Sequence, residues 1–141
     1  MNTKTLLAAL VGSIASFFLG WLIFGMLLAS YAKDHTVVYA GLMKDNPSLI
    51  PLIIANCCGA LLIAMICSWS NMVGLMKGAV IGATVGFLVE LSYDTFTVAF
   101  MNLYTDNTYV IVDVIASTIF MAVIGAIIGW MMGMGNKSAA A

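Results

Sequence analysis

The stretch YVIVDVIASTIFMAVIGAIIGWMM, residues 109–132, decides the fold class. It is apolar along its whole length and carries a single charged residue, Asp113. A helix of about 20 mostly apolar residues crosses roughly 30 Å of hydrocarbon, and this stretch is long enough to do so. Transmembrane β-strands alternate over about ten residues instead. The stretch therefore predicts a transmembrane helix.

Apolar runs of similar length precede it, and they predict helices over about 6–31, 49–69 and 77–100. The composition agrees, because 63% of the residues are hydrophobic and 8% are charged, whereas soluble domains carry about 25% charged residues. Most connections between the runs are short, which makes sequential helices antiparallel. We predict an all-α fold, an integral membrane four-helix bundle with both termini on the same side.

Residues 1–137 are expected to form one transmembrane domain, and residues 138–141 are a low-complexity tail that we exclude from the fold. The first run is too long for the apolar core of a signal peptide, so it is expected to be a retained helix. The chain has no basic patch, nucleophile–base pair, phosphate loop or zinc spacing. We expect neither an enzyme nor a nucleic-acid partner, and no cofactor. The three cysteines, whose spacing does not suit a disulfide within one helix, are expected to be small buried thiols: Cys57, Cys58 and Cys67.

The distribution of the lysines predicts the side of the membrane on which the termini lie. Three fall on the side of the termini (Lys4, Lys77 and Lys137) and two on the other side (Lys33 and Lys44). The positive-inside rule then places the termini in the cytoplasm. The longest polar connection, about 32–48, lies outside under this prediction, as a short interfacial helix or an ordered lid.

Small residues recur at four-residue spacing in three of the four predicted helices. Such residues let transmembrane helices approach closely, so they predict tight packing near the cytoplasmic end. The series are Gly12, Ser16 and Gly20; Gly78, Gly82 and Gly86; and Gly125, Gly129 and Gly133.

Acids continue two of these series towards the outer end. Because a step of four residues turns a helix face by only about 40°, Glu90 and Asp94 follow Gly86 on one side of their helix, and Asp113 lies on the corresponding side of the last helix. Asn56 and Ser117 are expected at a similar depth. The pattern predicts a bundle that is closed at the cytoplasmic end and opens around an acidic cleft at the outer end.

Apart from Lys77, at the very start of the third predicted span, no lysine lies within a predicted span, and the chain has no arginine. Ionisable groups inside a membrane are costly unless they face a cavity or a partner. Three alternatives could neutralise the acids: bound protons, a bound cation, or a side chain from the outer loop, namely Lys33, His35 or Lys44. A fourth interpretation is that the acids are simply hydrated near the interface. Ser117 and Tyr93 could supply hydrogen bonds.

The chain resembles the DUF1761 family of small bacterial membrane proteins and its relative DUF2177. The resemblance rests on Phe17-Phe18-Leu19-Gly20-Trp21, on a glycine-rich third helix that leads into Tyr93-Asp94, on Val112-Asp113-Val114 and on the closing Gly125-Ala126-Ile127-Ile128-Gly129-Trp130. It implies four transmembrane helices and a bacterial inner membrane. It implies no activity and assigns no functional residue.

From these patterns we expect the cleft to bind or conduct a cation, a proton or a small substrate through Glu90, Asp94 and Asp113, with no metal assigned. The alternatives are a structural subunit that packs against a larger membrane complex, and a lipid-binding protein. The expected partners are the lipid bilayer and either a second copy of the chain or a larger complex.

Overall fold

The computed structural model describes residues 2–42, 44 and 46–134 of the chain, so the tail at 138–141 lies outside the described residues. The fold is all-α, as predicted, and four of its helical segments are long and apolar enough to cross a membrane. This makes the chain a multi-pass membrane protein. The elements are α1 (Thr3–Leu22), the π-helical turn η1 (Ile23–Leu27), α2 (Ala29–His35), α3 (Leu49–Trp69), α4 (Leu75–Phe100) and α5 (Asn107–Gly133).

The first predicted helix is interrupted in the structure. The sequence suggested one continuous helix over about 6–31, but residues 23–27 form a π-helical turn, in which the Leu28 amide donates to the carbonyl of Ile23 at 2.8 Å. A π-turn takes one more residue per hydrogen-bonded turn than an α-helix, and such turns are frequent at functional sites. The remaining predicted helices begin and end within two residues of the observed ones.

Helices α4 and α5 are in backbone contact along their N-terminal and C-terminal halves, respectively. A Cβ atom added at Gly82 would overlap the carbonyl oxygen of Met121, and one added at Gly125 would overlap that of Gly78. The turn before α4 joins the same contact, because the Gly74 amide donates to the carbonyl of Gly129 at 2.8 Å. Gly74 has φ 115°, which side-chain-bearing residues rarely adopt.

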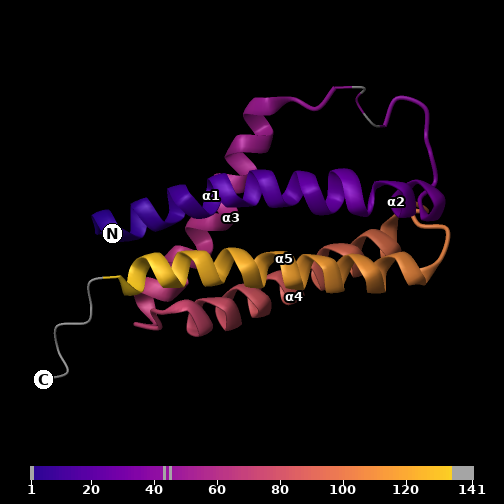
Figure 1. Ribbon diagram of the computed structural model, residues 1–141. Coiled ribbons are helices and arrows are strands. Elements are labelled where there is room, and N and C mark those ends of the chain that lie inside the picture. The colour runs from indigo at the N-terminus through magenta and orange to yellow at the C-terminus, as the bar shows by residue number, and fades with distance from the viewer. Residues whose placement is uncertain (1, 43, 45, 135–141) are drawn as a thin grey trace, which may run out of the picture.

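The core lies at the end of the bundle that holds the termini. Its fully buried members come from α1, α3 and α5 and include Ala8, Ile63, Ala64, Ile124 and Ile128. At this end, Lys4 donates to the carbonyl of Met134 at the C-terminus of α5, where a positive charge is favourable. Figure 1 shows the N-terminus and the end of α5 on the same side.

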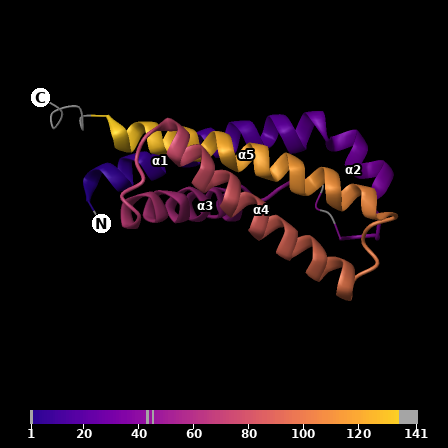
Figure 2. The same ribbon diagram turned by 90° about the horizontal axis from the view of Figure 1, so that it is seen from below.

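The helices separate towards the opposite end, which we call the α2 end. Figure 1 shows α3 crossing α1 and ending before it reaches the α2 end, and Figure 2 shows α4 leaving α5 towards that end. The connection after α2 pairs with the loop between α4 and α5, because Val37 donates to the carbonyl of Leu103 at 2.7 Å and Thr105 donates to that of His35 at 2.9 Å. Both expectations for this connection therefore hold in part: it begins with a short helix, and its next residues are ordered against the neighbouring loop.

Candidate functional site: a carboxylate cluster between α4 and α5

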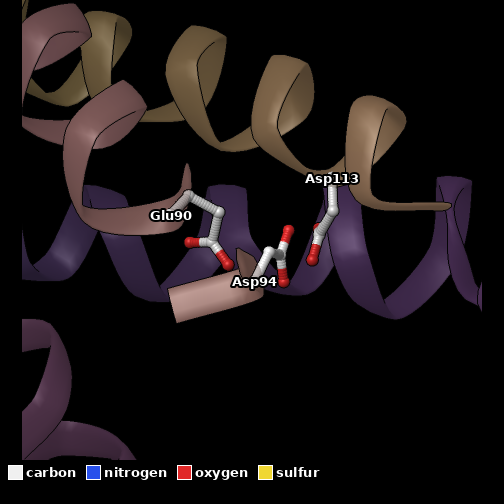
Figure 3. A group of neighbouring side chains, drawn as sticks. All are labelled: Glu90, Asp94 and Asp113. Atoms are coloured by element: carbon white, nitrogen blue, oxygen red, sulfur yellow. The ribbon is translucent and has the colours of Figure 1, made fainter. Parts of the chain in front are cut away.

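Glu90, Asp94 and Asp113 meet at the α2 end of the bundle. Glu90 and Asp94 are one turn apart on α4, and Asp113 lies in the second turn of α5. One carboxylate oxygen from each lies within 4.8 Å of those of the other two. Figure 3 shows the Asp94 carboxyl group between the other two side chains. The three oxygens are close enough together to be ligands of a single ion.

Asp94 is the most buried member, with no exposed surface. Its Oδ1 accepts a hydrogen bond from the hydroxyl of Tyr104 at 2.7 Å. Its Oδ2 is also buried, and it has no hydrogen-bond partner among the described residues. A buried oxygen without a partner costs about 1–3 kcal/mol, so this atom marks a place where a ligand would be stabilising.

The cluster has no cationic partner among the residues that the structure describes. Lys33 is exposed, Lys44 donates to Ser48 at 3.3 Å, and the His35 ring faces Asp106 at 3.8 Å between Nε2 and Oδ2. The alternative in which a loop side chain neutralises the acids is therefore wrong for these three residues. A proton and a bound cation remain, together with hydration.

A half-open cleft of about 290 Å³ lies beside the cluster. Glu90, Asp113 and Ser117 supply polar groups to it, while Phe24 and Phe120 supply aromatic rings. Phe24 belongs to η1, so the π-helical turn contributes an aromatic wall to the acidic cleft.

Aromatic rings cover the α2 side of the cluster. The Tyr104 and Tyr109 rings stack with centroids 4.9 Å apart, Tyr31 stacks on Tyr109 at 6.2 Å, and His35 stacks on Tyr31 at 4.0 Å. These residues connect α2 and the α4–α5 loop to the carboxylates. Tyr104 lies outside the spans, and burial, followed by its hydrogen bond to Asp94, raises the pKa of its hydroxyl, so this group stays protonated as a donor.

Asp106 is the N-cap residue of α5 and faces His35 from the α4–α5 loop. Its Oδ1 accepts hydrogen bonds from the amides of Thr108 and Tyr109 at 2.8 and 3.3 Å. Desolvation opposes ionisation, but these hydrogen bonds and the nearby His35 outweigh it and lower the pKa of the Asp106 carboxyl group. Asp106 thus holds the start of α5, and with it Asp113, in place.

Of the other residues that the sequence analysis singled out, only some lie near the carboxylate cluster. Ser117 lies on the cleft with the acids, but Asn56 lines a different hollow, and its side chain donates to the carbonyl of Leu52 in its own helix. Tyr93 is 61% exposed on the outer face of α4, and the hydrogen bond to Asp94 comes from Tyr104 instead. Cys57 and Cys58 are exposed rather than buried as expected, with the Cys57 Sγ atom 3.2 Å from the hydroxyl of Ser13 in α1, whereas Cys67 is buried.

The small residues at the terminus end make close contacts of two kinds. The glycines of α4 and α5 lie against backbone atoms of the other helix. At Gly12 of α1, by contrast, an added Cβ atom would lie 2.6 Å from the end of the Ile128 side chain. Gly20 is more loosely packed, with Phe120 at 3.8 Å. This closure at one end leaves the other end free to form the cleft.

Sequence reasoning missed Phe24, Phe120 and the role of Tyr104 at the site. Tyr104 lies ten residues from Asp94 in the sequence, a spacing that carries no helical signal. Phe24 faces the cleft through a π-helical turn that the hydrophobic pattern does not reveal. Phe120 could have been found, because it lies one turn beyond Ser117 on α5.

Comparisons of the chain with models of protein families, with curated proteins and with solved structures found no match. The family resemblance described above therefore stays a prediction.

Proposed function

We propose that this protein binds a cation inside the membrane, with the carboxylates of Glu90, Asp94 and Asp113 as its ligands. The observation that carries the proposal is the buried Oδ2 atom of Asp94, which has no partner among the described residues and belongs to a carboxyl group that lies between those of Glu90 and Asp113. A cation there would satisfy this atom and neutralise the cluster.

Electrostatics supports a ligand that exchanges with protons. Three carboxylates within a few ångströms repel one another strongly where the dielectric constant is low. Without a cation, the cluster must keep protons, and a cation that binds must displace them. This exchange is the property that a protein coupling proton and cation movement would need.

We propose a bacterial inner membrane with both termini in the cytoplasm, so that the α2 end faces outward. Supporting this direction, the sequence places three lysines on the side of the termini, Lys4, Lys77 and Lys137, and two on the other side, Lys33 and Lys44. Transport would require a second path across the closed end, where α4 and α5 are in backbone contact. Four helices leave little room for such a path, so a transporting form would be a dimer.

The test is thermal unfolding of the purified protein in mild detergent. The probes are the chlorides of sodium, magnesium, calcium, manganese and tetramethylammonium. We expect at least one of them to raise the midpoint of the wild-type protein and to leave the Glu90→Gln/Asp94→Asn variant unshifted. Asp34→Asn is the matched control, because Asp34 is an exposed acid outside the cluster.

A midpoint shift of the same size in the double variant would refute the site, and so would the absence of any shift in the wild-type protein. The structural-subunit alternative makes a different prediction. It requires that a larger complex be recovered from membranes in mild detergent, and recovery of this chain alone would count against it.

A further inference from the structure

A second hollow lies beside the acidic cleft. It is an apolar groove of about 600 Å³ between α1, α3 and α5. Its walls include Gly20 and Trp21 of α1, Leu52 and Gly59 of α3, and Phe120 of α5. The groove has unfilled space at its α3 wall, because a Cβ atom added at Gly59 would meet nothing within 4 Å.

The groove and the cleft share a wall. Phe24, Phe120 and Met121 line both hollows. The rings of Phe24 and Phe120 pack edge to face, with centroids 5.7 Å apart. Phe24, Phe120 and Met121 thus form a boundary that the acidic cleft and the apolar groove have in common.

The walls of the cleft distinguish between kinds of cation. A magnesium or calcium ion needs six or more oxygen ligands or waters around it. The side-chain oxygens of the cleft come from Glu90, Tyr109, Asp113 and Ser117, whereas Phe24, Val89, Phe120 and Met121 give it apolar and aromatic surface. An organic ammonium ion is weakly hydrated and is attracted to the faces of aromatic rings. The combination of carboxylates and aromatic rings therefore favours an organic cation.

The neighbouring groove indicates that the organic cation has an apolar substituent. Apolar surface stabilises an alkyl group by about 0.8 kcal/mol for each buried methylene. A ligand whose charged end is held among the carboxylates would reach the groove by passing Phe24 and Phe120. The charge of the cleft and the apolar groove next to it thus match the two ends of one amphiphilic molecule.

Resting on the cation site proposed above, we propose that the ligand is a lipophilic organic cation. Its ammonium group lies between Glu90, Asp94 and Asp113, next to the rings of Phe24 and Phe120. Its alkyl chain lies in the groove against Gly59 of α3. Binding is non-covalent. The carboxylates supply the negative charge that attracts the ammonium group, and the groove selects for the ligand's alkyl chain.

The experiment is calorimetric titration of the protein in nanodiscs of zwitterionic lipid. The probes are tetramethylammonium, butyltrimethylammonium, hexyltrimethylammonium and the neutral hexanol. We expect the affinity to rise about fourfold for each added methylene, and hexanol to show no saturable binding. The Glu90→Gln/Asp94→Asn variant should bind none of the cations.

The variant Gly59→Leu fills the groove, and Cys58→Leu adds the same side chain at the neighbouring exposed position. We expect the ratio of hexyl to tetramethyl affinities to fall towards one in Gly59→Leu and to keep its wild-type value in Cys58→Leu. If Gly59→Leu loses its helical circular dichroism spectrum, Phe120→Leu replaces it, and it should weaken binding of every ammonium probe by removing a ring.

Three outcomes would overturn this inference. The first is a ratio of hexyl to tetramethyl affinities that is the same in Gly59→Leu and Cys58→Leu, because the alkyl chain of the ligand would then lie in bulk lipid. The second is binding of tetramethylammonium or a metal ion without any gain from a longer chain, in which case the cation site stands and only the groove assignment falls. If no cation binds in a way that depends on the carboxylates, the proposed function falls as well.

Discussion

The backbone contact between α4 and α5 predicts that Gly82→Ala destabilises the protein. The added Cβ atom would overlap the carbonyl oxygen of Met121 and would lie 3.0 Å from the Cα atom of Gly125. Both are helix backbone atoms, which cannot rotate away, so the helices themselves must separate. Overpacking of this kind costs about 1–3 kcal/mol, and we expect a loss within that range.

Two further glycines are matched controls for this substitution. In Gly12→Ala the added Cβ atom would meet the end of the Ile128 side chain at 2.6 Å, which can move more easily than a backbone, so the loss should be smaller than at Gly82. In Gly59→Ala it would meet nothing within 4 Å, and the variant should be neutral or gain up to about 1 kcal/mol from the lower entropy of its unfolded chain.

The assay is reversible unfolding in mixed micelles with a rising fraction of sodium dodecyl sulfate, followed by circular dichroism. The three variants should rank in stability as Gly59→Ala, then Gly12→Ala, then Gly82→Ala. A Gly82→Ala variant that is as stable as Gly59→Ala would refute the close approach of α4 and α5, and with it the closed end of the bundle.

Three smaller substitutions test the contacts around the site and the termini. Tyr104→Phe removes the hydrogen bond to Asp94 Oδ1 and should cost about 1–3 kcal/mol in the same unfolding assay; unchanged stability would contradict that contact. The lowered pKa of Asp106 means that its contribution to stability is present above its ordinary pKa of 3.8 and is lost as the pH falls below it. Wild-type protein should therefore lose more stability than Asp106→Asn between pH 5 and pH 2, and equal losses would refute the role of its charge. Lys4→Met removes the hydrogen bond to the Met134 carbonyl and should cost about 0.3–1 kcal/mol; a more stable variant would contradict it.

The sequence predicted the helices because membrane spans depend on long apolar runs, which are local. It also predicted the acidic cluster, because Glu90 and Asp94 share a face through four-residue spacing and the depth of Asp113 follows from the length of α5. The three acids do approach one another within 4.8 Å. Both inferences need only helix geometry and the thickness of a bilayer.

The parts that escaped prediction depend on departures from regular geometry. The π-helical turn at residues 23–27 turns Phe24 towards the cleft, and no periodic pattern signals such a turn. Tyr104 reaches Asp94 from a loop, where side-chain direction is set by tertiary contacts. Asn56 was expected at the depth of the acids, but depth does not specify the face, and Asn56 lines the groove between α1, α3 and α5 instead.

We propose that the carboxylate cluster exchanges protons for a cation. This exchange is tested most directly by proton release, recorded with a pH-indicator dye while the cation probes are added to weakly buffered protein in nanodiscs. The claim predicts saturable release from the wild-type protein with at least one probe, and none from the Glu90→Gln/Asp94→Asn/Asp113→Asn variant. Equal release from both proteins, or no release from the wild-type protein with any probe, would contradict it.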